Sequence, residues 1–527
     1  MNSSPSRRAR GRALITRLCV GLSAGVMVAS LACKPKEPAA PPVDPAAEAA
    51  AKAQADKEAA AKDRADKAAA KRAELAALPP LPGVEAPKAV DFPKPIVSSL
   101  DNGLEVIVLE DHEMPVVDIS LVVKAGNIYA PAEHSKLAAL TANLLEEGTK
   151  KLKKEDLDTK IDATGGSKSV SAGDELVVLG ADVLARDADL GMKLLAAEAM
   201  EPTFPEESFK KIKDLMIQEV ESQKSSPFGL ALQMGEHVIF GDKSPYGRPF
   251  PSDAEINALT RDQVVAFYDR HYHPGNAMLV IAGDITADKA AKLAKKHFGK
   301  WKAGEAIAPP SGDKQTAPDK TVVHLIDRSA SAQATIAVVV PAPKIGEAGY
   351  LDGKILQATL GGGLSGRLNQ VLREQLGLTY GVGAFNSYGY EGGMFFAGGS
   401  TKTKSAGEFT EALLELLKEP AEKGIPADEL GRIQSKLSGQ FALEVEGVGV
   451  MASKTITQRT YGLAPDFWER YRVDIEAATP EQLKASSQAL WGGPVQIIAI
   501  GRASKLKDAL SAFGEVRVYD TSLKPQG

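Results

Sequence analysis

Apolar residues recur at helical spacing between residues 136 and 149. Leu137, Leu140, Leu144 and Leu145 fall on one face of a 3.6-residue period, and Gly148 follows as a stop signal. We predict a buried helix here. The side chains on its remaining face decide which chemistry this part of the chain supports.

Runs of β-branched residues flank this helix. They predict strands at residues 105–109, 116–123, 175–180 and 277–282. Amphipathic patterns predict helices at residues 185–199 and 206–223. Strands and helices mixed in this way indicate an α+β fold.

One pattern occurs twice along the chain. Ala277-Met-Leu-Val-Ile-Ala-Gly-Asp precedes a predicted helix and then His297-Phe-Gly, and Val495-Gln-Ile-Ile-Ala-Ile-Gly precedes a predicted helix and then Ala512-Phe-Gly. This echo suggests an internal duplication. The loop-forming Ala308-Pro-Pro-Ser-Gly marks the break before a predicted strand at residues 321–326. We therefore expect an N-terminal domain at residues 91–307 and a C-terminal domain at residues 308–527.

The first 90 residues follow a different pattern. Five arginines within residues 7–17 precede an apolar run at 18–32, which is typical of a secretory signal peptide and short for a membrane span. Cys33 ends the sequence Ala-Ser-Leu-Ala-Cys, which resembles a bacterial lipoprotein cleavage site. We predict a signal peptide at residues 1–32 and lipidation of Cys33. An ordinary signal peptide with an incidental thiol is the alternative.

Residues 33–90 form the predicted tether. Its first part is rich in proline, and residues 46–77 are alanine with lysine, aspartate and glutamate, which favours a solvated helical spacer, with disorder as the alternative. Lys34 after Cys33 favours the outer membrane, facing the periplasm. The net charge of −5 gives no attraction for nucleic acid.

Several stretches together resemble the pitrilysin/insulinase family of zinc peptidases, which includes mitochondrial processing peptidase. They are the predicted helix at 136–149, Leu100-Asp-Asn-Gly-Leu-Glu-Val-Ile-Val, Ser244-Pro-Tyr-Gly-Arg-Pro and His271-Tyr-His-Pro-Gly-Asn. The resemblance implies two homologous α+β domains, each a mostly antiparallel sheet packed with helices, that face each other around a chamber.

In that family the helix reads Gly-Leu-Ala-His-x-x-Glu-His before Gly-Thr, where both histidines bind zinc and the glutamate activates water. Counting back from Gly148-Thr149 places these positions on Ala139, Ala142 and Asn143. Alanine has no lone pair for a metal, and an asparagine amide is a poor replacement for imidazole. We expect no catalytic residue, metal or cofactor in this chain.

Glu219 matches the family's distal third ligand, because 219 − 143 = 76. One carboxylate without two imidazoles is a weak zinc site, so we predict a structural or surface role for it. The seven histidines contain no His-x-x-x-His pair that would indicate a relocated site.

The second half carries a glycine turn, Gly361, Gly362 and Gly363, followed by a predicted helix. No Gly-Lys-Ser/Thr follows, so this is not a phosphate loop. In the family an arginine and a tyrosine at this spacing bind the substrate backbone and polarise the scissile carbonyl, and they match Arg373 and Tyr380. The glycine N–H groups either bind an extended peptide or form a tight turn alone.

The family includes subunits without a zinc motif that pair with a zinc-bearing partner. The resemblance thus implies a non-catalytic, lipid-anchored subunit of the bacterial cell envelope. Its partners would be a homologous subunit that holds the zinc, in a heterodimer, and a peptide or unfolded protein substrate. Two alternatives stay open: an envelope lipoprotein that binds peptides or proteins without proteolysis, and an active zinc metalloendopeptidase with an unconventional metal site.

Overall fold

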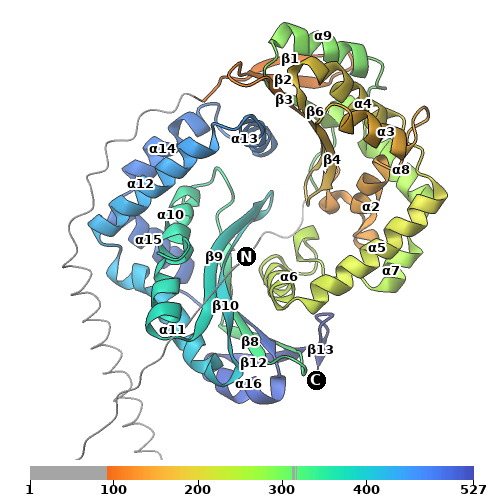
Figure 1. The fold of residues 1–527 in the computed structure, drawn as a ribbon. Helices are drawn as coiled ribbons and strands as arrows, with labels where there is room; N and C mark the ends of the chain where they lie inside the picture. Colours follow the sequence, from red (N-terminus) through yellow and green to blue (C-terminus); the bar gives the residue numbers. More distant parts are fainter. Residues whose placement is uncertain (1–91, 311–314, 316, 527) are drawn as a thin grey trace, which may run out of the picture. The chain divides into compact units, whose positions relative to one another are not determined.

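The computed structural model describes residues 92–310, 315 and 317–526, which all belong to one compact unit. The predictions for the signal peptide, Cys33 and the tether lie outside these residues. The described chain forms two β-sheets, each packed with helices (Figure 1). None of its helices is long and apolar enough to cross a membrane.

The first sheet has six strands in the order β1-β2-β6-β3-β5-β4. They are β1 (Ile96–Ser99), β2 (Glu105–Glu110), β3 (Val116–Val123), β4 (Ser167–Ala172), β5 (Val177–Leu184) and β6 (Ala277–Gly283). All neighbours are antiparallel except β2 and β6, which run parallel.

The second sheet has seven strands in the order β13-β12-β7-β11-β8-β10-β9. They are β7 (Val322–Asp327), β8 (Gln333–Ala342), β9 (Thr379–Gly389), β10 (Gly392–Lys402), β11 (Gln496–Gly501), β12 (Glu515–Tyr519) and β13 (Pro525–Gln526). The strand β7 runs parallel to both β11 and β12, and the other neighbours are antiparallel.

The two sheets share one topology. The five-strand core β2-β6-β3-β5-β4 of the first sheet corresponds to β7-β11-β8-β10-β9 of the second, with the same single parallel pair within it. This correspondence confirms the α+β fold of two homologous domains that the repeated strand and helix pattern predicted.

Helices pack on both sheets. Those of the first half are α2 (Leu137–Leu145), α3 (Lys154–Asp162), α4 (Ala188–Met200), α5 (Glu206–Ser225), α6 (Pro227–Phe240), α7 (Asp253–Ala258), α8 (Arg261–His271) and α9 (Ala287–Phe298). Those of the second half are α10 (Tyr350–Gly361), α11 (Ala406–Lys423), α12 (Ala427–Glu444), α13 (Val448–Tyr461), α14 (Phe467–Ala477), α15 (Pro480–Trp491) and α16 (Ala503–Leu510).

In each half, one helix packs on the sheet of the other half. Helix α6 follows α5 in the first half, yet it packs on β8 and β11 of the second sheet. Helix α13 follows α12 in the second half, yet it packs on β3 and β6 of the first sheet. In these contacts Met234 joins a cluster with Val339, and Met451 joins one with Val280. Figure 1 shows both helices apart from the strands of their own half.

Most predicted elements are present, with shifts at their ends. The helix predicted at residues 185–199 begins with a 3₁₀ turn, Ala185–Asp187, before α4. The strand predicted at 175–180 is β5, which continues to Leu184 because Ala181 and Val183 extend the buried alternation. Strand β3 has the bounds that the pattern predicts.

Candidate functional site

Helix α2 is the predicted buried helix. Its leucines and alanines are good helix formers, and Leu137, Leu140, Leu144 and Leu145 are all buried. Thr141, also buried, donates its hydroxyl to Leu137 O at 2.8 Å. The chain turns after the helix at Gly148, whose φ of +126° is one that a glycine adopts readily.

The face of α2 that the leucines leave open carries Ala139 and Asn143, at positions i and i+4, and Glu146, the C-cap residue of the helix, follows at i+7. Ala142 is fully buried. The open face thus coincides with the positions that bind zinc in the resembling family. Neither alanine can bind zinc, and an amide oxygen suits it poorly, so these side chains do not fit the metal. Among the described residues, no group of three histidine, cysteine or acidic side chains could hold a metal ion.

A lysine lies beside this face instead. Lys168 projects from β4, the edge strand that packs against α2, and its side chain is only 5% exposed. Its Nζ lies 3.0 Å from Glu198 Oε1, 3.2 Å from Asp158 Oδ1 and 3.4 Å from Glu146 Oε1. We call these four residues the Lys168 cluster. It joins the open face of α2 to α3, α4 and the edge of the first sheet.

Two members of the cluster, Glu198 and Lys168, have shifted pKa values. Burial raises the pKa of Glu198 to about 7, although the Lys168 ammonium acts in the opposite direction. Burial also opposes the charge on Lys168, but Glu198, Glu146 and Asp158 outweigh it and raise the pKa of Lys168 to about 12. Sequence reasoning missed this cluster, because Lys168 alternates with serines and resembles a solvent-facing strand residue.

Glu219 lies on α5, which packs against α2. Its side chain is exposed, and its Oε1 accepts a hydrogen bond from Gln223 Nε2 at 3.2 Å. This hydrogen bond does not direct the carboxylate of Glu219 toward a metal-binding side chain. This position agrees with the surface role that we expect for it.

The glycine turn of the second half closes α10, which occupies the place in its half that α2 occupies in the first. A Cβ on Gly361 would lie 2.2 Å from the backbone nitrogen of Ala384 on β9, so the loop packs directly on this strand. Gly363 has a φ of +87°. The loop therefore needs glycine for its own geometry, whether or not it also binds a peptide.

Asn369 fixes this loop. It is 6% exposed, and its Nδ2 donates to Gly363 O at 3.0 Å and to Val382 O of β9 at 2.7 Å. It begins a π-helix, Asn369–Gln375, a form that often occurs at functional sites. Sequence reasoning missed Asn369. An asparagine within a helical pattern, just after the glycines, was the available signal.

Arg373 and Tyr380 follow on this π-helix and on β9. The Arg373 side chain is 39% exposed, with its Nε 3.4 Å from Glu374 Oε1. Tyr380 is 85% exposed. A pocket of about 330 Å³ lies beside Tyr380, with small residues of β9 and β10 and Phe228 of α6 in its lining. Gly362 and Gly363 line another pocket, and Arg373 and Gly361 line neither of the two, so the structure does not bring the predicted site residues into one hollow.

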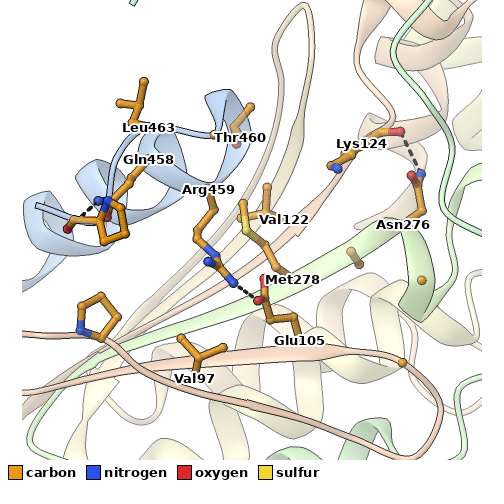
Figure 2. A pocket seen from close by; sticks show the side chains of 16 residues that line it. Val97, Glu105, Val122, Lys124, Asn276, Met278, Gln458, Arg459, Thr460 and Leu463 are labelled. Atoms are coloured by element: carbon orange, nitrogen blue, oxygen red, sulfur yellow. Dashed lines mark hydrogen bonds and ion pairs between the residues drawn. The ribbon is translucent and has the colours of Figure 1, made fainter. Parts of the chain in front are cut away.

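A third pocket, of about 550 Å³, lies where α13 covers the first sheet. Figure 2 shows Arg459 of α13 pointing to Glu105 of β2, with which it forms an ion pair. Residues of the first sheet line this pocket, and among them Met278 of β6 lies opposite Glu105 of β2 and Val122 of β3 in the strand register. Its lining includes none of the predicted site residues, and it marks the junction between the sheet and the helix from the other half.

Comparisons with known proteins extend this description. The family model described as "Insulinase (Peptidase family M16)" matches residues 105–245, and the one described as "Peptidase M16 inactive domain" matches residues 258–437. An uncharacterized zinc protease of Streptomyces coelicolor is 27% identical over 387 residues, which cover 70% of this chain and 82% of that protein. One of Rickettsia felis is 26% identical over 358 residues, covering 67% and 84%.

Solved structures share the fold. A peptidase M16 inactive domain from Pseudomonas fluorescens has a TM-score of 0.70 at 24% identity, covering 77% of this chain and 98% of its own. A protease from Helicobacter pylori has a TM-score of 0.71 at 20% identity, covering 77% and 99%. The periplasmic protease PqqL from Escherichia coli has a TM-score of 0.66 at 16% identity, covering 80% and 47%. The resemblance to the pitrilysin/insulinase peptidases is thus confirmed, and this chain belongs to peptidase family M16.

Proposed function

We propose that this chain is a non-catalytic subunit of an M16 metallopeptidase of the cell envelope. It contributes Arg373, Tyr380 and the glycine loop to the active site of a homologous subunit that holds the zinc. We further propose that Cys33 carries a lipid that anchors the chain, with the outer membrane as the expected location.

The asymmetry between the two halves carries this proposal. Ala139, Ala142 and Asn143 do not suit zinc, and the carboxylate of Glu146 is paired with Lys168. In the second half, Tyr380 and Arg373 stay accessible, on elements that Asn369 holds in place. A phenol and a guanidinium can donate to peptide oxygens and to an oxyanion. The chain thus keeps donors for a substrate while it lacks the residues that activate water.

The pocket beside Tyr380 favours a second candidate, an envelope protein that binds peptides without proteolysis. Its lining combines the Phe228 ring with Gly381 and Gly383, where an added Cβ would meet no atom within 4 Å, which leaves room for an extended backbone. This candidate needs no partner subunit.

The test compares zinc content and peptide cleavage of the purified chain, alone and mixed with a zinc-motif homologue from the same cell. We expect no stoichiometric zinc and no cleavage alone, and cleavage in the mixture. Arg373→Ala or Tyr380→Phe should lower that cleavage about a hundredfold, by the loss of transition-state donors. Arg432→Ala, on the exposed side of α12, is the matched control and should leave it unchanged.

Two results contradict the subunit proposal in different ways. Peptide binding by the lone chain, without cleavage in any mixture, identifies the binding protein. Stoichiometric zinc with chelator-sensitive cleavage by the lone chain identifies an active peptidase with an unconventional metal site, and both proposals then fail.

A further inference from the structure

A pocket of about 500 Å³ in the second half has an unusual charge balance. Its lining includes three lysines, Lys354 of α10, Lys436 of α12 and Lys454 of α13, but a single acid, Glu444. Aromatic rings form much of the remaining wall: Tyr350, Tyr388, Phe441, Trp468 and Tyr471. We call this hollow the lysine pocket.

Two of the lysines have partners of their own. Lys436 Nζ donates to the carbonyl of Gly362. Lys454 Nζ lies 3.3 Å from Glu444 Oε2 and sits over the rings of Phe441 and Trp468, 4.7 and 4.8 Å from their centroids. The single acid is thus already engaged by one of the three cations.

Lys354 is the lysine that these contacts leave least compensated. Its Nζ lies 5.8 Å from the centroid of the Tyr350 ring. Burial, and then repulsion by Lys454, lower the pKa of Lys354, and Glu444 offsets this only in part. A half-buried ammonium beside other cations and aromatic rings attracts an anion more strongly than a solvated lysine does, because little water screens it.

The lysine pocket also touches the glycine loop. Gly362 and Gly363 belong to its lining, and Lys436 binds the loop directly. If the loop holds a peptide backbone, as the proposed function has it, a side chain leaving that backbone would find this pocket beside it. The aromatic rings of the pocket wall would pack on the methylene groups of such a side chain. The lysine ammonium groups would attract a negative charge at its end.

We propose that the lysine pocket receives an acidic side chain of the bound peptide and selects peptides that carry glutamate or aspartate near the glycine loop. This inference rests on the proposed role of the loop in peptide binding. It adds a substrate preference that neither Arg373 nor Tyr380 supplies, because both act on the peptide backbone.

The test uses three fluorescent peptides of alanine, leucine and serine that differ only in a central glutamate, glutamine or lysine. Their binding is measured by fluorescence polarisation, with the chain alone and with its zinc-bearing partner. We expect the glutamate peptide to bind about tenfold more tightly than the glutamine peptide, and the lysine peptide to bind most weakly. Lys354→Met should remove this preference, so that the glutamate and glutamine peptides bind with equal affinity.

Two further variants support the reading of these results. Lys505→Met, at an exposed lysine of α16, is the matched control and should keep the preference. Glu444→Gln removes the acid from the pocket and should strengthen binding of the glutamate peptide roughly threefold. This gain of affinity cannot come from loss of folding.

The two proposals fail differently. Equal affinities for the glutamate and glutamine peptides, or a preference that survives Lys354→Met, overturn the acidic preference while the peptide-binding role stands. If none of the three peptides binds, alone or with the partner, the peptide-binding role of the loop fails as well.

Discussion

Glu198 gives the clearest quantitative test of the first half. It is 1% exposed, and burial raises its pKa from 4.5 to about 7 despite the ammonium of Lys168 at 3.0 Å. In the unfolded chain this carboxyl ionises near its ordinary pKa. The folded state keeps the proton to higher pH, so its stabilising contribution is complete below about pH 4.5 and is lost as the pH rises to about 7.

The magnitude follows from the pKa difference. About 2.5 pH units, at about 1.4 kcal/mol each, correspond to about 3 kcal/mol of unfolding free energy. Glu198→Gln removes the ionisable group and keeps the shape of the side chain. The unfolding free energy of the wild type minus that of this variant should therefore fall by about 3 kcal/mol between pH 4.5 and pH 7.5.

Urea unfolding at several pH values, followed by tryptophan fluorescence, measures this difference. Asp118, whose pKa burial also raises to about 7, titrates in the same range, but it is present in both proteins and cancels. Glu446→Gln, which makes the same substitution at an exposed position after α12, is measured in parallel as the matched control. A flat difference for Glu198→Gln would mean that Lys168 keeps the carboxylate ionised throughout, and would refute the reasoning.

Three further outcomes concern the second half. Gly361→Ala should destabilise the chain by about 1–3 kcal/mol in thermal unfolding, because the added Cβ would lie 2.2 Å from Ala384 N. The control is Gly439→Ala on α12, where an added Cβ meets open space, and it should stabilise the chain by about 0.5–1 kcal/mol. Asn369→Ala should cost roughly 1–3 kcal/mol in urea unfolding, since it removes the hydrogen bond to the buried carbonyl of Val382 and the one to Gly363 O; an unchanged midpoint would contradict this role. Tyr380→Phe should leave the melting temperature unchanged, because the ring is 85% exposed, and a large shift would show that the hydroxyl has a structural role.

The strands and helices whose formation depends mainly on residues close in the sequence could be predicted from the sequence. Strand β3 and helix α2 follow from alternation and from helical spacing, and the duplication follows from the repeated strand, glycine and helix. The same local information places Arg373 just before Tyr380 on adjoining elements. For these elements, tertiary packing stabilises the same strand or helix that the local sequence pattern already favours.

Features made by distant segments could not be predicted in this way. The burial of Lys168 depends on carboxylates from α2, α3 and α4, and no local pattern shows that three helices converge on one strand residue. The lysine pocket likewise combines α10, α12 and α13. The amphipathic pattern of α6 shows that one face is buried, but it does not show which sheet covers that face.

The exchange of α6 and α13 between the halves also constrains how the chain can be made. Every strand of the first sheet has been synthesised once Gly283 is added to the chain, yet α13, which covers one face of that sheet, begins only at Val448. Until then the apolar side chains of Leu109, Val280 and Met278 lack the helix that covers them in the folded chain. Such distant contacts slow folding and expose surfaces that aggregate. A chain truncated before residue 448 would contain a complete first sheet and still leave it with a bare apolar face.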